Sequence, residues 1–340
     1  MTTYKDAGVD IEIKKKALEK VKAMVKSTFT GLSVSNATMF KFGGGIDLKA
    51  LKEKEPILIL SADGVGTKMM VAEMAGKYDT VGMDLVHHCA NDILTSGAKP
   101  IFFLDYIAAS KLKPEIMLEI VKGVSTACKN LSIALAGGET AEMPDVYFDG
   151  RYELAGVIGG IVEADRAIDC SKISEGDVLI GLASNGLHTN GYSLARKIFF
   201  KDNKCKVSDY VEELGETLGS ALLKTHREYA TLLLPLIEKK LVKGLAHITG
   251  GSFKKNIARI MPQGLGAEIK ENWPVPPIFK LIEKLGNVPK EDMRQTFNNG
   301  IGMIAIVAKE DSNDAMRLIG EKTFVIGKVV KGEGIKYVDS

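Results

Sequence analysis

The motif DGVGTK, residues 63–68, joins a carboxylate, two glycines, a threonine and a lysine directly after a short apolar run. A carboxylate at the end of a buried strand is well placed to bind a hard cation such as Mg²⁺ through oxygen. Gly64 and Gly66 carry no side chains, so backbone N–H groups there could approach a phosphate closely. Thr67 could cap a following helix, and Lys68 could supply a mobile positive charge. The alternative is an ordinary strand–turn–helix connection, since the Walker A pattern is absent.

A second motif, HHCAND at residues 87–92, is expected on a helix. His88 and Asp92 are four residues apart and would share one helix face, a spacing that can chelate a transition metal such as zinc. The alternative is a polar stripe on a buried helix, with Asp92 as an oxygen ligand for Mg²⁺. The two readings differ in the metal that they predict.

A third motif, GGETAEMP at residues 137–144, follows another short apolar run and places two carboxylates beside a double glycine. Carboxylate oxygens are the ligands that a Mg²⁺–polyphosphate site needs. We therefore predict that Asp63, Asp92 and Glu139 together bind the metal. Each of these carboxylates taken singly would be read as a surface residue.

Two polar loops in the second half add donors and histidines. Residues 184–193 (SNGLHTNGYS) contain His188, and residues 246–252 (AHITGGS) contain His247 and end where a helix is expected to begin. A glycine turn at a helix N-terminus suits a phosphate monoester. A lone histidine is more often structural than catalytic. The GxGxxA pattern at residues 300–305 lies before a strand rather than a helix, so no dinucleotide-binding fold is predicted.

The elements that must position these motifs are strands and helices in both halves of the chain. Short apolar runs predict strands, for example over residues 57–60 and 302–307, and 3–4 spacing predicts helices, including a long one over 217–240. The polar segment 163–177 reads as a junction. We therefore predict a mixed α/β fold with two domains, residues 1–168 and 169–340.

Composition limits the class of protein. The 340 residues carry 45 Lys+Arg against 43 Asp+Glu, a net charge of +2, and a near-neutral chain with few arginines is not expected to bind nucleic acid. The four cysteines are scattered and form no CxxC pair, which is typical of a reducing compartment. No apolar stretch is long enough to cross a membrane. We predict a cytoplasmic protein without nucleic-acid or membrane partners.

Taken in order, these motifs resemble one family. The segments DAGVD (6–10), DGVGTK, NDI, GAKPIFFLDY (97–106), GGETAEMP, HTNGYSL and HITGG are similar to those of the phosphoribosylformylglycinamidine cyclo-ligases, or aminoimidazole ribonucleotide synthetases. The resemblance runs from about residue 4 to about residue 330. The related thiamine-monophosphate kinases, selenophosphate synthetases and a hydrogenase maturation factor share the acidic motif after the first strand, but are not expected to combine GGETAEMP, HTNGYSL and HITGG.

The resemblance implies a two-domain subunit whose N-terminal sheet forms the core of a homodimer. It also implies an ATP- and Mg²⁺-dependent enzyme of purine biosynthesis, which converts formylglycinamidine ribonucleotide into 5-aminoimidazole ribonucleotide. The alternatives are a small-molecule kinase of the same superfamily and a non-catalytic nucleotide-binding protein. Two motifs depart from the family pattern: residues 41–45 read KFGGG rather than a longer GGFGG-like run, and HITGG is followed by Ser252 rather than a third glycine.

The resemblance also implies roles for single residues. Lys68 would act at the γ-phosphate, while His188, His247 and Glu142 are candidates for removing the proton from the cyclising nitrogen, with no means of choosing among them. The ribose phosphate would bind at Thr249, Gly250 and Gly251. The remaining residues expected to contact the nucleotide are Gly43, Gly44, Gly45, Asp63, Gly64, Gly66, Thr67, Asn185, Asn190 and Ser193.

Overall fold

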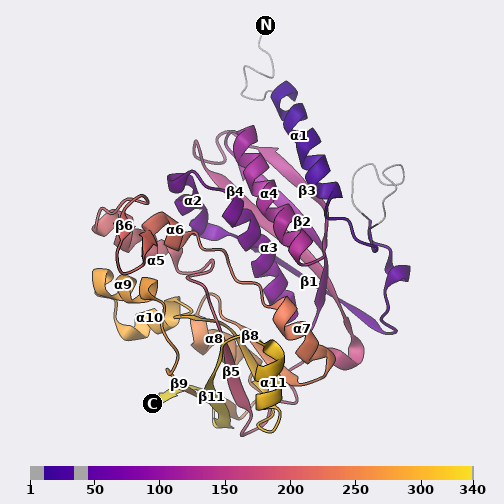
Figure 1. Cartoon of the computed structure of the whole chain (residues 1–340), viewed down its shortest axis with the longest axis vertical. Helices are drawn as coiled ribbons and strands as arrows, with labels where there is room; N and C mark the ends of the chain where they lie inside the picture. The colour runs from indigo at the N-terminus through magenta and orange to yellow at the C-terminus, as the bar shows by residue number, and fades with distance from the viewer. Residues whose placement is uncertain (1–10, 34–44, 339–340) are drawn as a thin grey trace.

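The computed structural model describes residues 11–33 and 45–338, with the backbone alone for residues 11–18 (Figure 1). The helices are α1 (Ile11–Lys26), α2 (Met69–Ala75), α3 (Asp79–Leu94), α4 (Pro114–Asn130), α5 (Tyr192–Arg196), α6 (Leu218–Leu222), α7 (Ala230–Glu238), α8 (Ser252–Ile260), α9 (Pro277–Gly286), α10 (Lys290–Thr296) and α11 (Ser312–Ile319). The strands are β1 (Pro56–Gly64), β2 (Lys99–Ala109), β3 (Ala134–Glu142), β4 (Tyr152–Glu163), β5 (Val178–Ala183), β6 (Tyr210–Val211), β7 (Glu216–Thr217), β8 (Val242–His247), β9 (Leu265–Lys270), β10 (Ile301–Val307), β11 (Thr323–Lys331) and β12 (Gly334–Val338). The predicted mixed α/β fold is confirmed.

The first sheet has four strands in the order β1-β4-β2-β3. β4 is antiparallel to both of its neighbours, whereas β2 and β3 are parallel and are connected through α4. Helices α3 and α4 cover one face of this sheet, and α1 packs against α4 and β3 (Figure 1). On the other face the apolar side chains of Leu58, Leu60 and Val157 are exposed.

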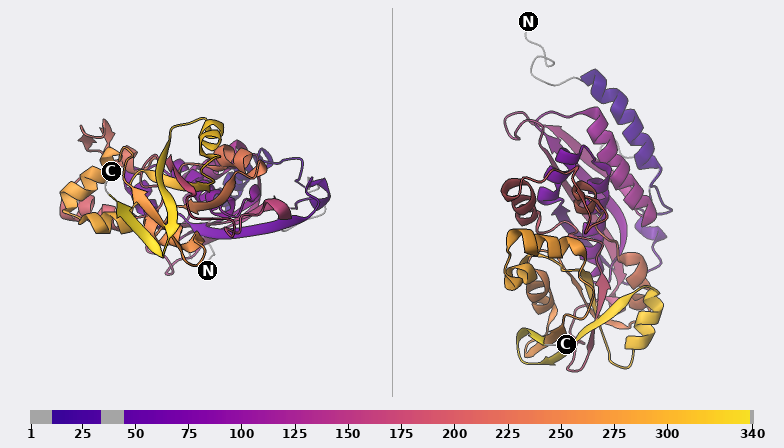
Figure 2. Two further views of the ribbon diagram at one scale, coloured as in Figure 1. Left: turned by 90° about the horizontal axis from the view of Figure 1, so that it is seen from below. Right: turned by 60° about the vertical axis from the view of Figure 1, so that its left-hand side comes forward.

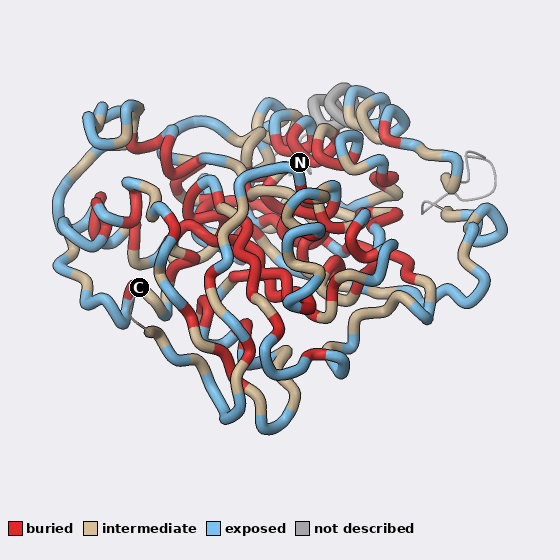
Figure 3. Tube along the Cα trace, turned by 60° about the horizontal axis from the view of Figure 1, so that its bottom comes forward, coloured by how far each residue is buried: buried red, intermediate tan, exposed pale blue. Residues whose placement is uncertain are grey.

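The second sheet has six strands in the order β12-β9-β11-β5-β10-β8, and among them only β12 and β9 are parallel. Helices α7 and α11 pack on one face and α8 packs on the other, so that the sheet lies between two helical layers (Figure 2). Burial on both faces explains why Ile301–Val307 is apolar or glycine at every position and buried throughout. In Figure 3 the buried segments gather in the interior of the molecule, with exposed segments around its edge.

Each half of the chain contributes apolar side chains to the core of the other half. Leu94, at the end of α3, packs in the cluster formed by α7 and the second sheet. Conversely, Tyr192, Leu222 and Phe279 of the second half belong to the cluster built on α3 and α4. The connection between the sheets runs from Glu163 to Val178, and the boundary at residues 168 and 169, which lies within it, stays a prediction. In the described ranges no helix combines the length and apolar character needed to span a bilayer.

The predicted long helix over residues 217–240 is wrong. The structure has two helices there, α6 and α7, separated by residues 223–229, which lie against α3. Pro235 sits inside α7 and does not cause the break. The interruption places His226 and the backbone of Arg227 in contact with buried polar groups of α3, contacts that a continuous helix would not allow.

Helices α3 and α4 touch through two glycines. A Cβ on Gly123 would overlap the carbonyl oxygen of Asp79, and a Cβ on Gly82 would overlap that of Ile120. The helices therefore cross at backbone contact, which side chains would prevent. This close approach positions the face of α3 that carries the HHCAND motif.

We expect Gly123→Ala to lower the free energy of unfolding by about 1–3 kcal/mol, because the added methyl group forces two packed backbones apart. Urea denaturation monitored by circular dichroism measures the change. Gly31→Ala is the matched control, since a Cβ at Gly31 has nothing within 4 Å. Equal stability of the two variants would contradict the contact.

Candidate active site

A cavity of about 580 Å³ opens where the end of β1 and the middle of α3 face the end of β8 and helix α8. Both halves of the chain contribute polar groups to its wall. The lining residues predicted from the sequence are Asp63, Gly64, Gly66, Asp92, Asn190, His247, Thr249 and Gly250. The structure thus brings parts of four separate motifs to one place.

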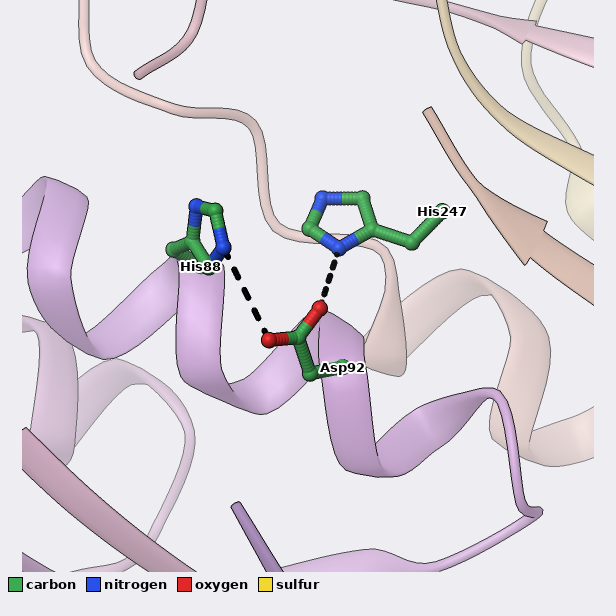
Figure 4. A group of neighbouring side chains, drawn as sticks. All are labelled: His88, Asp92 and His247. Atoms are coloured by element: carbon green, nitrogen blue, oxygen red, sulfur yellow. Dashed lines mark hydrogen bonds and ion pairs between the residues drawn. The ribbon is translucent and has the colours of Figure 1, made fainter. Parts of the chain in front are cut away.

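Two carboxylates and two imidazoles form the centre of this wall. His88 Nε2 lies 2.8 Å from Asp63 Oδ2 and 3.6 Å from Asp92 Oδ2. His247 Nδ1 lies 2.8 Å from Asp92 Oδ1. Figure 4 shows Asp92 pointing from α3 between the two rings. His88 and Asp92 share one helix face as predicted, and the chain adds His247 from the other domain.

One ligand atom from each of His88, Asp92 and His247 lies within 4.8 Å of the other two, a spacing that can hold a metal ion. The surroundings shift the pKa values of Asp63, His88 and His247. Burial raises the pKa of Asp63, but the hydrogen bond and charge of His88, with the N–H of Gly64 and the charge of His247, together outweigh burial and hold this pKa below its usual value. Burial likewise lowers the pKa of His88, and the two carboxylates outweigh it so that this pKa is raised. For His247 burial dominates, and its pKa is lowered.

All five histidines of the chain gather beside the cavity. His226 was absent from every motif considered, yet its Nε2 lies 3.0 Å from Nε2 of His247. His188 stacks on His226 with ring centroids 4.1 Å apart and does not line the cavity. Burial lowers the pKa of both His188 and His226 well below the usual value. His188 is therefore a buried neighbour of the site rather than part of its wall.

Helix α3 reaches the loop of residues 223–229 through a row of buried polar side chains. Asp84 accepts from the backbone N–H of His226 at 2.5 Å, and His87 Nδ1 lies 2.7 Å from the carbonyl oxygen of that residue. Asn91 donates to the carbonyl oxygen of Arg227 and accepts from the N–H of Tyr229. The spacing of these side chains along α3 is one face of a helix, so the polar stripe proposed from the sequence is real and binds the other domain.

Lys68 completes that contact, and its predicted mobility is wrong. Its Nζ lies 2.7 Å from Asp84 Oδ2 and donates to the carbonyl oxygen of Lys224 at 2.7 Å, and both charged side chains are 0% exposed. A lysine enclosed and paired in this way is not free to follow a phosphate. The predicted cap at Thr67 is wrong as well, because its hydroxyl lies 3.3 Å from Ser193 Oγ and accepts no helix N–H.

Glu139 and Glu142 lie far from Asp63 within one chain. They lie on β3, whereas Asp63 lies on β1, at the opposite edge of the four-stranded sheet. Three strand spacings separate the two edges, or about 14 Å. Glu142 accepts from the N–H of Leu112 and thus fixes the loop before α4. The predicted three-carboxylate site of Asp63, Asp92 and Glu139 is therefore not assembled by a single subunit.

The remaining residues predicted to contact the nucleotide lie in several different places. Gly43 and Gly44 lie outside the described residues, and Gly45 precedes Ile46, which bridges to Ser33. Asn185 lines a separate hollow of about 870 Å³ near Thr217 and Lys224. Gly251 is the residue before α8 and has a φ of +87°, which favours glycine.

Two cations of the cavity were missed from the sequence. Lys255 and Arg259 lie one turn apart on α8 and line the cavity together with Thr249 and Gly250. The signal was present, since these residues follow the HITGG turn at helical spacing. It was not recognised because basic residues on an amphipathic helix are usually solvated.

Both halves of the chain match models of AIR synthase related proteins, the N-terminal domain over residues 47–162 and the C-terminal domain over residues 174–340. Among solved structures, the thiamine-monophosphate kinase of Stenotrophomonas maltophilia K279a has a TM-score of 0.67 at 16% identity, with 94% of this chain and 95% of that chain covered. A hydrogenase maturation protein HypE in complex with ATP has a TM-score of 0.64 at 15% identity, covering 91% and 84%. These likenesses define the class, two-domain α/β proteins of the AIR synthase type.

The curated relatives are more specific. A phosphoribosylformylglycinamidine cyclo-ligase of Alkaliphilus oremlandii is 47% identical, with 97% of each chain covered. The protein with that name from Thermoanaerobacter pseudethanolicus is 48% identical, covering 97% of this chain and 98% of its own. The chain belongs to the phosphoribosylformylglycinamidine cyclo-ligase family.

The burial of Lys68 predicts a structural role for this residue rather than a role at the γ-phosphate, and the two roles can be told apart by experiment. We expect Lys68→Met to lower the free energy of unfolding by about 3–5 kcal/mol, because Asp84 would remain buried without its counter-charge. Lys197→Met is the control: it removes an exposed ion pair with Asp202 and should cost less than about 1 kcal/mol. Chemical denaturation of both variants measures the difference. A Lys68→Met protein as stable as the parent but inactive would instead support the role at the γ-phosphate.

Proposed function

We propose that the protein catalyses the ATP-dependent cyclisation of formylglycinamidine ribonucleotide to 5-aminoimidazole ribonucleotide, with release of ADP and phosphate. The observation that carries the proposal is the interdomain cavity, in which a carboxylate–imidazole cluster faces a glycine turn flanked by two cations. Family membership supports the same reaction. Each part of the cavity matches one requirement of the chemistry.

The first requirement is a leaving group. An amide oxygen is a poor one, so ATP would phosphorylate the formyl oxygen, and phosphate would leave when the ring closes. The carboxylates of Asp63 and Asp92 both reach toward His88 Nε2 and so lie close together, with Asp63 45% exposed at the cavity. Hard oxygen ligands of this kind fit Mg²⁺, which when bound would neutralise charge on the phosphates. Glycines at positions 64 and 66 leave the backbone next to Asp63 open to those phosphates.

The second requirement is removal of a proton from the attacking amidine nitrogen. His247 and Asp92 line the cavity as a hydrogen-bonded pair, in which the Asp92 carboxylate could take the proton while the ring of His247 donates a hydrogen bond to it. His188 is shielded behind His226, and Glu142 lies on the far edge of the first sheet. Of the three candidates only His247 lines the cavity, and we favour a role for it through the Asp92 carboxylate, which would accept the proton.

The third requirement is a place for the ribose phosphate. The turn Thr249–Gly251 precedes α8, whose nine residues present a positive N-terminal end, and Lys255 and Arg259 line the same part of the cavity. A phosphate monoester with close to two negative charges would be attracted to this side and repelled by the carboxylates. The ribonucleotide would thus lie with its phosphate at α8 and its formyl group toward Asp63.

We further propose a homodimer formed through the first sheets. Support comes from the open face of that sheet, where Leu58 is 50% and Leu60 is 58% exposed. Large apolar side chains on an uncovered sheet face mark an interaction surface. Within such a dimer, Glu139 and the glycine-rich segment 43–45 are the remaining groups proposed for ATP. We keep the cytoplasm as the proposed compartment, supported by the four free cysteines.

We expect incubation with ATP, Mg²⁺ and formylglycinamidine ribonucleotide to release inorganic phosphate together with an equal amount of a diazotisable aminoimidazole. Asp63→Asn should lower kcat by orders of magnitude without loss of folding, because one oxygen ligand of the metal becomes a neutral amide. A phosphorylated product without phosphate release would show a kinase. ATP binding with no substrate-dependent turnover would show a non-catalytic nucleotide-binding protein.

We expect Lys255→Met to raise KM for the ribonucleotide about 10- to 100-fold, since a charge-assisted hydrogen bond to phosphate is worth about 1.5–3 kcal/mol. The KM for ATP should change little. Lys254→Met is the matched control, because Lys254 is exposed on the same helix and does not line the cavity. Steady-state kinetics with each substrate varied in turn measures both constants. Equal effects of the two substitutions would remove Lys255 from the phosphate site.

A further inference from the structure

His226 occupies an unusual position between the domains. Its side chain is 0% exposed, and its loop is fixed by Asp84 and His87 of α3. Neither ring nitrogen reaches the cavity. Nε2 lies 3.0 Å from His247 Nε2, and Nδ1 lies 3.3 Å from Thr189 Oγ1. The ring therefore contacts the candidate active site only through other side chains.

These contacts are part of a continuous hydrogen-bonded chain. From one carboxylate to the other it runs through Asp92, His247, His226, Thr189, His88 and Asp63. The separations, in that order, are 2.8, 3.0, 3.3, 2.7 and 2.8 Å. Every link joins a donor to an acceptor only if the protons are arranged in a particular direction.

Both ends of the chain are carboxylates, which only accept, so one histidine must carry protons on both ring nitrogens. His88, whose pKa the neighbouring carboxylates raise, is that ring: it donates Nε2–H to Asp63 and Nδ1–H to Thr189, and the other two rings are neutral.

An ionised carboxylate only accepts, so His247 must donate its Nδ1–H to Asp92. In a neutral ring Nε2 of His247 then carries a lone pair, and His226 must supply the proton from its own Nε2. Nδ1 of His226 in turn accepts from the hydroxyl of Thr189. In the opposite tautomer of His226, two lone pairs would face each other at 3.0 Å inside the protein.

We propose that His226 is a positioning residue for the reaction: its Nε2–H holds the ring of His247 in the orientation that presents Nδ1–H to Asp92. The Asp92 carboxylate thereby keeps its place in the cavity wall. Without His226, Nε2 of His247 would be a buried acceptor with no donor, a state that costs about 1–3 kcal/mol and that rotation of the ring would relieve. The hydrogen bond itself does not depend on the proposed function, whereas its effect on turnover does.

The hydrogen bond can be observed directly in the unliganded protein. With ¹⁵N-labelled histidine, the five rings give five pairs of nitrogen signals, and those of His247 are identified by their loss in His247→Gln. We expect a scalar coupling across the N–H···N bond between the two Nε2 nitrogens, with the proton on His226. Absence of the coupling, or a proton on Nε2 of His247, would overturn the proposal.

Turnover separates positioning from packing. His226→Leu and His226→Phe keep apolar bulk but remove the donor, and we expect kcat to fall about 10- to 100-fold with KM for ATP unchanged. We specify two such variants so that, if one of them fails to fold, the other still tests the proposal. His226→Gln restores an amide donor and should regain most of kcat. A Gln variant no better than Leu and Phe would refute positioning through the hydrogen bond.

His87→Gln is the matched control. It keeps a side chain that can donate to the carbonyl oxygen of His226 and changes no member of the hydrogen-bonded chain, so kcat and the nitrogen coupling should stay close to those of the parent. Loss of the coupling in this variant would assign the effect to the loop rather than to the imidazole. If the parent protein carries out no cyclisation, the proposed function fails, and the coupling still decides the inference about His226.

Discussion

The structure depends on the buried ion pair between Lys68 and Asp84, because this pair holds the loop of the second domain against the helix of the first. Asp84 also accepts from the N–H of His226, and Lys68 also donates to the carbonyl oxygen of Lys224. A buried ion pair adds little stability compared with apolar packing, but breaking one is costly. Its effect here is specificity, since the charges are satisfied only when residues 224–226 lie in one position.

That constraint explains why the candidate site can be built from two domains. Asp63 and Asp92 come from the first domain, and His247 comes from the second, yet their atoms meet at hydrogen-bond distances. Such precision requires that the elements carrying them do not slide. The backbone contact at Gly82 and Gly123 fixes α3 against α4. The loop of residues 223–229, bound through Asp84, fixes α3 against the second domain. Helix α3 is therefore the common reference for both halves of the cavity.

The sequence predicted the members of the site better than their arrangement. Strand-end glycines and carboxylates pointed to Asp63, which lines the cavity, and helical spacing placed His88 and Asp92 on one helix face, where they lie 3.6 Å apart. The order β1-β4-β2-β3 could not be read from the sequence, so nothing there indicated that Glu139 lies at the opposite edge from Asp63. The role of His226 depends on a break in an apolar pattern that reads as one helix, and the break is determined by tertiary contacts with α3 rather than by local propensity.

Negative and positive side chains line opposite sides of the cavity, and this separation of charge limits how a substrate can bind. Carboxylates line the side formed by β1 and α3, whereas Lys255 and Arg259 line the side formed by α8. A phosphate monoester is repelled by the first side unless a cation intervenes, so it is stable only at the second. A metal-bound triphosphate has the opposite preference, since its cation is attracted to the carboxylates. In the proposed reaction the two anionic groups would therefore be directed to opposite walls, and the reacting atoms of the ribonucleotide and ATP would meet between them beside Asp92 and His247.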